Sequence, residues 1–322
     1  MNSAFIFPPV APRPVRSVLG EIPYTTLGIT DAHNHVWIDP IPGADGAAPV
    51  LNQYDAIRTE LRSYRSGGGA SILDCQPGGC GRDGRRLVQL SKDSGVQILA
   101  CTGFHRQKYY TPGYWLFSAS SQAVAEYFSA ELSQSLEETR GQAEIVRAGF
   151  IKVALEAGWK STPLPALEAS AEAARASRAL VAVHTEKGAL AEKAVIFYEQ
   201  RGVAPQQLVL CHVDKRPDLS LHAELARYGV LVEYDTFYRP KYEPETRLWP
   251  LIEGMVQLGL SHRVALATDM AEASMYASIG GGPGLASLPV EIKHRLTKMG
   301  IPEQAIQQML GGNIARRLAG LD

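Results

Sequence analysis

The chain alternates short runs of β-branched and other apolar residues with longer segments in which apolar residues recur at helical spacing. A buried strand reads as a continuous apolar run and a surface helix repeats every 3.6 residues, so the alternation predicts strands followed by helices. Elements in this order form a parallel sheet covered by helices. The eight predicted strands are Ile29–Val36, Ser71–Cys75, Gln97–Gly103, Phe150–Leu155, Ala179–Thr185, Leu208–Val213, Val230–Thr236 and Val264–Met270.

Helices are predicted between these strands and after the last of them. Two of the helices, Pro289–Met299 and Pro302–Leu318, begin with proline, which suits the first turn of a helix. Eight strand–helix units favour a closed (β/α)8 TIM barrel of the α/β class, although periodicity alone does not exclude a doubly wound open sheet. The other predicted helices are Leu51–Tyr64, Asp83–Asp93, Ser121–Leu136, Leu167–Ser177, Gly188–Gln200 and Leu219–Tyr228.

The length fits one barrel domain over residues 27–320, with an N-terminal arm over 1–26 and an extra helix at the C-terminal end. The apolar run Ala4–Phe7 is followed by four prolines before it reaches the length of a secretion signal, so Met1–Gly20 is expected to be irregular. No later segment approaches the roughly 20 uninterrupted apolar residues that span a bilayer. We therefore expect a soluble protein with no membrane partner.

The charges nearly cancel, with 32 Lys and Arg against 33 Asp and Glu and a net charge of −1. Without a basic excess there is no electrostatic footprint for nucleic acid or for an anionic membrane, so we expect a small-molecule partner. The four cysteines show no Cys-x-x-Cys spacing, which favours reduced thiols and a cytoplasmic location. They are Cys75, Cys80, Cys101 and Cys211.

Four histidines lie at the ends of predicted strands. His33 and His35, two residues apart, project from one face of an extended segment and could chelate a metal. His184 ends the fifth strand and His212 ends the sixth. One such histidine is more often a hydrogen-bonded core residue, and a His-x-His pair alone is a weak signal. Four are difficult to explain as packing, because each imidazole needs a polar partner, and a metal ion would satisfy them together.

Two charged residues also fall in apolar strands. Asp269 ends the eighth strand, where an ionised carboxylate is costly to bury without a cation or donor. It is either a metal ligand that can also accept a proton from water, or the N-cap of the following loop. Lys152 lies inside the fourth strand. It either pairs with a carboxylate, which the residues alone favour, or adds CO2 to its neutral amine to give a carbamate that can bridge two metals.

In these residues the chain resembles the phosphotriesterase family of the amidohydrolase superfamily, over about residues 27–318. That family has His-x-His after the first strand, a carboxylated lysine on the fourth, histidines after the fifth and sixth and an aspartate after the eighth. The segments Cys80–Asp83, Ala100–Gly103 and Phe150–Ala154 are also similar to it. The positions that match the family pattern are His33, His35, Lys152, His184, His212 and Asp269.

The resemblance implies two divalent metal ions, with zinc first and manganese, cobalt or iron as alternatives that also suit mixed nitrogen and oxygen ligands. It implies that a bridging hydroxide attacks the substrate, that Asp269 is catalytic and passes a proton to the leaving group, and that the protein is a homodimer. One metal would be held by His33, His35 and Asp269, the other by His184 and His212, and N6-carboxylysine at Lys152 would bridge them.

The leading expectation is hydrolysis of a lactone or related carboxylic ester. Three stretches look like the lactonase-type branch of the family: His212–Asp218, Lys241–Tyr242 and Gly280–Leu285. Some members of that branch hold a phosphate with an arginine shortly after the last aspartate, and this chain has Glu272 there, so a substrate phosphate stays open. The alternatives are phosphotriester or N-acyl amide hydrolysis and, in another class, a barrel that binds metal or ligand without turnover.

Substrate contacts are expected from the loops after the third, seventh and eighth strands. His105 stands where relatives often place an aromatic residue that lines the pocket. Arg239 and Lys241 either pair with an anionic substrate group or are solvated loop charges. The expected contacts are His105, Tyr238, Arg239, Lys241 and Tyr242.

Overall fold

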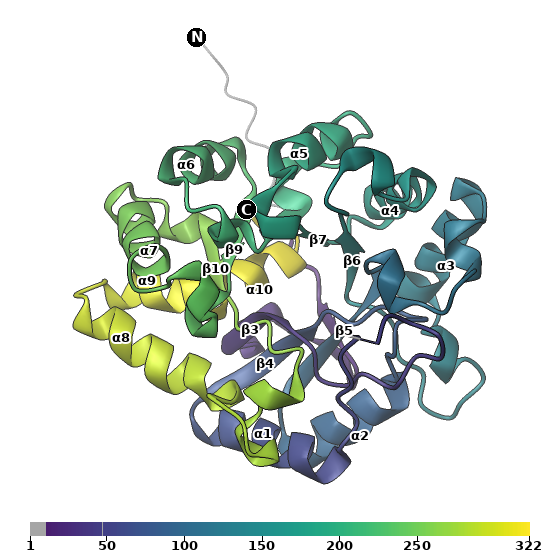
Figure 1. Cartoon of the computed structure of the whole chain (residues 1–322), viewed down its shortest axis with the longest axis horizontal. Helices are drawn as coiled ribbons and strands as arrows, with labels where there is room; N and C mark the ends of the chain where they lie inside the picture. Colours follow the sequence, from purple (N-terminus) through teal and green to yellow (C-terminus); the bar gives the residue numbers. More distant parts are fainter. Residues whose placement is uncertain (1–10, 47) are drawn as a thin grey trace.

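The computed structural model describes residues 11–46 and 48–322, and eight parallel strands form a ring at its centre (Figure 1). Neighbours in the ring follow the order of the chain. All eight predicted strands are present and helices surround them, so the (β/α)8 barrel is confirmed. The strands are β3 (Ile29–Asn34), β4 (Gly69–Asp74), β5 (Gln97–Gly103), β6 (Phe150–Ala154), β7 (Val181–His184), β8 (Leu208–Cys211), β9 (Leu231–Tyr234) and β10 (Val264–Leu266).

Several strands end just before the polar residue that closes the predicted run. His35, His212 and Asp269 therefore lie in the first residues of loops. The strand ladder stops there because the chain turns: φ is 65° at His212 and 46° at Asp269, in the left-handed region that a strand does not include. Non-glycine residues adopt this region rarely, and such residues concentrate at functional sites.

The ring closes between β3 and β10 through side chains as well as backbone. The backbone N–H of Asp269 donates to the carbonyl of His33 (3.0 Å). Asp31 accepts from the backbone N–H (3.1 Å) and the hydroxyl (2.5 Å) of Thr268. The amide of Asn34 donates to Asp31 and to Oγ1 of Thr268, both at 2.7 Å. We call Asp31, Asn34 and Thr268, all buried, the seam.

Apolar side chains pack on both faces of the strands, because successive residues of a strand point to opposite sides. Ile72 and Ile98 point outward to the cluster beneath the helices, whereas Leu73 and Leu99 point into the barrel. Phe150 belongs to the inner cluster. Three of the four cysteines lie there too, and all four are buried and unpaired.

The predicted helices are present with shifted ends, except that Pro302–Leu318 is interrupted at Leu310 and Gly311, where φ and ψ are not helical, and forms the two helices α9 and α10. One further helix was not predicted. Helix α7 contains Pro250 and Gly254, which weaken its helical signal. Pro250 lies in the first turn, where its missing N–H needs no partner. A Cβ on Gly254 would lie 2.7 Å from the side chain of Leu219, so glycine permits close packing on α6. The helices are α1 (Tyr54–Ser66), α2 (Gly84–Ser94), α3 (Ser121–Ser133), α4 (Leu164–Ser177), α5 (Ala191–Glu199), α6 (Leu219–Tyr228), α7 (Leu248–Gln257), α8 (Lys293–Lys298), α9 (Glu303–Gln307) and α10 (Asn313–Leu318).

The N-terminal segment is more regular than predicted. β1 (Val15–Ser17) and β2 (Gly20–Ile22) form an antiparallel hairpin. The N–H of Val18 donates to the carbonyl of Ile98 (2.8 Å), which ties the hairpin to the barrel. Strands this short give no periodic signal, so the expectation of an irregular arm is wrong for them. The run Ala4–Phe7 lies outside the described residues. In the described part of the chain, every helix is too short or too polar to cross a membrane.

Candidate metal centre and pocket

Polar side chains from six of the eight strands converge at the carboxyl ends of the barrel, where a TIM barrel carries its site. Lys152 lies on β6 and His184 is the last residue of β7. His212 follows β8 and Asp269 follows β10. The structure brings together all six predicted positions, with His33 and His35 from the first strand of the barrel.

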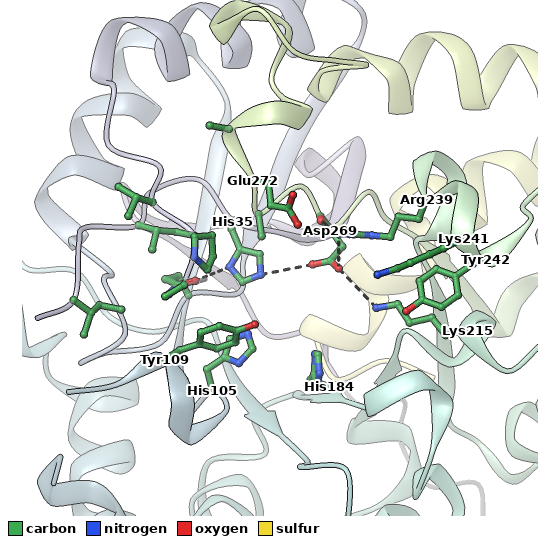
Figure 2. Close-up of a pocket in the computed structure, with 18 residues that line it drawn as sticks. His35, His105, Tyr109, His184, Lys215, Arg239, Lys241, Tyr242, Asp269 and Glu272 are labelled. Atoms are coloured by element: carbon green, nitrogen blue, oxygen red, sulfur yellow. Dashed lines mark hydrogen bonds and ion pairs between the residues drawn. The ribbon is translucent and has the colours of Figure 1, made fainter. Parts of the chain in front are cut away.

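His33 lies at the centre of this group. Its Nε2 is 2.8 Å from Nζ of Lys152 and 3.8 Å from Oδ1 of Asp269. Nε2 of His35 lies 3.7 Å from the same oxygen, and its Nδ1 is bonded to Oε1 of Gln76 (2.6 Å), which fixes the ring (Figure 2). One ligand atom each from His33, His35 and Asp269 lie within 4.8 Å of one another. Such a group can hold one cation.

Lys152 is fully buried, yet among the described residues no carboxylate forms an ion pair with its Nζ. Its polar neighbour is His33, an imidazole rather than an anion. The pairing with a carboxylate that the residues alone favoured is therefore not found. Burial lowers the pKa of Lys152, but nearby thiols and the carboxylates of Asp269 and Glu233 outweigh burial and raise it, although neither carboxylate forms an ion pair with Nζ.

The two remaining histidines stand beside His33. The ring centroids of His33 and His212 are 4.5 Å apart, as are those of His184 and His212. Nδ1 of His212 is hydrogen-bonded to Asp235 and lies 3.8 Å from Oδ2 of Asp269. Nε2 of His184 lies 3.7 Å from the carboxylate of Glu186.

Two carboxylates of this group were not predicted. Oε2 of the buried Glu233, on β9, accepts the backbone N–H of His212 (3.1 Å) and lies 3.4 Å from Nδ1 of His33. Asp235 follows β9 and is bonded to His212. The signal was present in the sequence, because two acids two residues apart in an apolar strand must share one face. Glu233 and Asp235 could have been found in the same way as His33 and His35.

The buried histidines are held neutral. Burial lowers the pKa of His33 well below its usual value. Burial lowers the pKa of His35 to about 4, although Asp269 opposes it. The pKa of His212 is lowered by burial and by Lys215. A neutral imidazole keeps a lone pair, which is the form that binds a metal.

The neighbours of Asp269 hold it as a carboxylate. Burial favours its protonated form, but His212, Lys215 and Arg239 outweigh burial and lower the pKa. Nη2 of Arg239 donates to Oδ2 (3.1 Å) and to the backbone carbonyl (2.6 Å) of Asp269. Nζ of Lys215 lies 3.9 Å from Oδ2. The carboxylate is therefore fixed in place with Oδ1 turned toward His33 and His35.

Several buried polar atoms of the group have no hydrogen-bond partner among the described residues: Nδ1 of His33, Nε2 of His184, Oε1 of Glu233 and Oδ1 of Asp235. Each unpaired buried group costs about 1–3 kcal/mol, so four together are unlike ordinary packing. Neutral imidazole nitrogens and carboxylate oxygens are the donors that zinc and similar divalent cations take. The donor set fits a metal ion.

A pocket of about 450 Å³ lies over the group (Figure 2). His35, His184 and Asp269 reach its surface. The loop after β3 contributes apolar side chains, and the loops after β8 and β9 contribute cations. The apolar residues of the loop after β3 are Ile38, Ile41, Ala48, Pro49 and Val50. The charged residues of the pocket are Lys215, Arg239, Lys241, Asp269 and Glu272.

Four of the five expected substrate contacts line this pocket: His105, Arg239, Lys241 and Tyr242. The expectation for Tyr238 is corrected. It lies on the turn after β9, but its hydroxyl donates to Oε2 of Glu291 (3.0 Å), in a different cavity. The apolar loop after β3 was missed, because its residues carry no polar group that would mark them.

The comparisons with known proteins agree with this geometry. The family model described as the phosphotriesterase family matches residues 13–318. A phospho-furanose lactonase from Mycoplasmopsis synoviae is 27% identical over 321 residues, covering 94% of this chain and 91% of the relative. An N-acetyltaurine hydrolase from Salmo salar is 26% identical and covers 94% of this chain and 97% of the relative.

The solved structures give the same result. The crystal structure of an amidohydrolase from Mycoplasma synoviae matches with a TM-score of 0.86 and 26% identity, covering 96% of this chain and 92% of that chain. The family match spans nearly all of the described barrel and includes every strand that contributes to the metal group. The chain therefore belongs to the phosphotriesterase family, and it is an enzyme of the hydrolase class.

Proposed function

We propose that the protein is a binuclear metal-dependent hydrolase that cleaves lactones or related carboxylic esters. The observation that carries the proposal is the convergence of His33, His35 and Asp269 within 4.8 Å of one another, beside a buried Lys152 that forms no ion pair with a carboxylate among the described residues. The similarity to a phospho-furanose lactonase over 94% of this chain supports the substrate class.

In this proposal Lys152 is carboxylated. Its neutral amine adds CO2, an N–C bond forms, a proton leaves, and the resulting carbamate supplies anionic oxygens. When bound, two divalent cations, zinc or else manganese, cobalt or iron, polarise the substrate carbonyl and lower the pKa of water. His33, His35 and Asp269 would hold one cation, His184 and His212 would hold the other, and carboxylated Lys152 would offer its oxygens to the metal centre.

The side chains around the centre hold the substrate and move the proton. Asp269, held as a carboxylate by Arg239 and Lys215, accepts the proton of the attacking water and returns it to the leaving oxygen as the C–O bond breaks. Nδ1 of His105 accepts the backbone N–H of Arg106 (2.7 Å), so its Nε2 carries the ring proton. His105 thus offers the substrate a hydrogen-bond donor.

Two lysines are proposed to hold an anionic group of the substrate. Nζ of Lys215 lies 5.8 Å and Nζ of Lys241 lies 5.1 Å from the ring centroid of Tyr242, so both ammonium groups lie near one aromatic ring. Lys241 has no carboxylate partner among the described residues, and its charge is free to pair with a ligand.

N-acyl amide hydrolysis is the second candidate, supported by the similarity to an N-acetyltaurine hydrolase, because the same attack reaches an amide carbonyl. Phosphotriester hydrolysis is the third. A barrel that binds metal without turnover is the alternative of another class. A cytoplasmic location is supported by the four buried, unpaired cysteines. A homodimer rests on the family resemblance alone, and light scattering would test it.

The test is metal analysis of the purified protein combined with a panel of lactones, esters, N-acyl amides and phosphotriesters. We expect about two metals per chain and turnover of lactones or esters that a chelator abolishes and added metal restores. If only amides or only phosphotriesters were hydrolysed, that class would replace lactones and esters as the proposed substrate. A folded, metal-loaded protein without turnover of any kind would favour the non-catalytic barrel.

A further inference from the structure

The loop between β3 and α1 turns an apolar surface toward the pocket. Ile38, Ile41, Pro49 and Val50 line it. Ile38 is buried, but Val50 is 42% exposed, which is high for a large apolar side chain at the edge of a pocket. When a ligand covers apolar surface that water otherwise contacts, the free energy of binding becomes more favourable.

This apolar wall is held in place rather than loose. Ile38 and Leu51 exchange two backbone hydrogen bonds, of 2.8 and 2.9 Å, at the two ends of the loop. The N–H of Asp39 donates to the carbonyl of Gly81 (2.8 Å), and that of Asp45 donates to the carbonyl of Lys108 (3.0 Å). A surface formed before the ligand arrives costs less entropy on binding.

The opposite side of the pocket is cationic. In Figure 2, Lys215, Arg239 and Lys241 lie together beyond Asp269, whereas most of the side chains drawn without nitrogen or oxygen lie on the far side of His35. The metal-binding group lies between the two sides. A carbonyl attacked there would have an apolar wall on one side and ammonium groups on the other.

We propose that the substrate is an amphipathic acyl ester or acyl amide, with an apolar acyl chain against Ile38, Ile41, Pro49 and Val50 and an anionic leaving group at the lysine side. This rests on the proposed hydrolase function and favours open-chain esters and amides over lactones among its candidate substrates. The bond between the acyl carbon and the leaving oxygen or nitrogen breaks, water supplies the new oxygen of the acid, and its proton goes to the leaving group.

The charge of the pocket favours a single negative charge on that leaving group. Its three cations face two carboxylates, Asp269 and Glu272, and Glu272 lies in the loop after β10. Figure 2 shows Glu272 beside His35 with its carboxylate turned into the pocket. The three cations exceed the two carboxylates by one charge, which a single carboxylate on the ligand balances, whereas a phosphate dianion would leave one negative charge uncompensated. The ligand class is therefore a monoanion such as a carboxylate.

Four matched probes test the proposal. Octanoyloxyacetate carries both features, acetoxyacetate lacks the chain, octanoyloxyacetamide lacks the charge, and 2-(octanoyloxy)ethyl phosphate carries a dianion. We expect kcat/KM for octanoyloxyacetate to exceed each of the others about tenfold or more. An acetyl or uncharged probe that reacts equally well would overturn the amphipathic substrate, and a preferred phosphate would overturn the monoanion.

Two variants locate the contacts. Val50→Ser should lower the preference for octanoyl over acetyl about threefold to tenfold, while Val290→Ser, a valine 50% exposed on another face, should leave it unchanged. Lys241→Gln should lower the preference for octanoyloxyacetate over octanoyloxyacetamide. If neither Val50→Ser nor Lys241→Gln changed its substrate preference, the acyl chain would not contact Val50 and the anionic group would not contact Lys241.

A binding measurement distinguishes failure of this substrate proposal from failure of the hydrolase proposal. If no probe is hydrolysed by the metal-loaded protein, calorimetric titration with octanoyloxyacetate and acetoxyacetate still tests the pocket. Tighter binding of the octanoyl probe by about tenfold would support the apolar wall while the hydrolase proposal fell. Equal binding would overturn the wall independently of turnover.

Discussion

Oε2 of Glu233 lies 3.4 Å from Nδ1 of His33 and accepts the backbone N–H of His212, so one carboxylate joins histidines from two different strands. Partners behind metal-binding histidines fix the orientation of the ring. Glu233→Gln should weaken metal binding about tenfold to a hundredfold. Competition with a chromophoric chelator measures it.

The matched control for this change is Glu172→Gln, an exposed glutamate on α4. It should bind metal as the unmodified protein does. If Glu233→Gln also binds metal normally, Glu233 contributes only to packing around β9.

The protein should bind its full amount of metal only when CO2 is present to carboxylate Lys152. Apoprotein reconstituted with zinc in CO2-depleted buffer is expected to bind less metal than with added bicarbonate, because the carbamate would be missing. ¹³C-bicarbonate should give a carbamate signal in the NMR spectrum that Lys152→Ala lacks and the exposed control Lys298→Ala keeps. Equal metal uptake with and without bicarbonate would leave Lys152 as a plain amine.

Removal of the metal should lower the melting temperature without unfolding the protein at 25 °C. A ligand at about a thousand times its Kd stabilises the folded state by about 4 kcal/mol, which corresponds to a shift of roughly 6 °C in a chain of this size. The two apolar clusters keep the apoprotein folded. Calorimetry before and after chelation checks this, and an unchanged melting temperature after complete metal loss would contradict it.

The seam contributes to stability through its hydrogen bonds. Thr268→Val removes a hydroxyl that donates to Asp31 and accepts from Asn34, and it leaves both buried partners short of one bond. We expect a loss of about 2–4 kcal/mol in the free energy of unfolding, measured by denaturant titration. Thr246→Val, at an exposed threonine, should change it by less than about 0.5 kcal/mol. A change this small at Thr268 would mean that the backbone alone closes the barrel.

Asp74 should make the protein less stable as the pH rises from about 4 to about 7. Burial raises its pKa to about 7, against an ordinary value of 3.8. In this window the folded carboxyl keeps a proton that the unfolded one has lost, so the folded state is progressively disfavoured, by up to about 4 kcal/mol.

Asp74→Asn cannot ionise and can still accept the N–H of Val36, which Oδ1 accepts at 2.7 Å. The difference in unfolding free energy between this variant and the unmodified protein should therefore grow toward pH 7. Asp55→Asn, at a side chain 85% exposed, serves as the control. A difference that stays constant from pH 4.5 to 7.5 would show that Asp74 does not titrate there.

The barrel was predictable because buried parallel strands read as apolar runs, and a charged or imidazole side chain in such a run stands out. For the same reason the meeting of Lys152, His184 and Asp269 follows from strand order, once the ring is closed. Helix α7 was not predictable, since Pro250 and Gly254 interrupt the helical spacing of its apolar residues. The wall around Val50 was not either, because its role depends on which loops face one another across the barrel mouth.

The seam also has a consequence for how the protein is made. Asp31 and Thr268, which it joins, are 237 residues apart in the chain. His33 and Asp269, beside them, meet only when the last strand has left the ribosome and taken its place next to the first. A nascent chain stopped before β10 would hold histidines without the aspartate, and it would leave the edge of β3 open to pairing with other chains. If the proposed metal site is correct, acquisition of metal would be a check on complete synthesis, since the full set of proposed ligands exists only in a finished barrel.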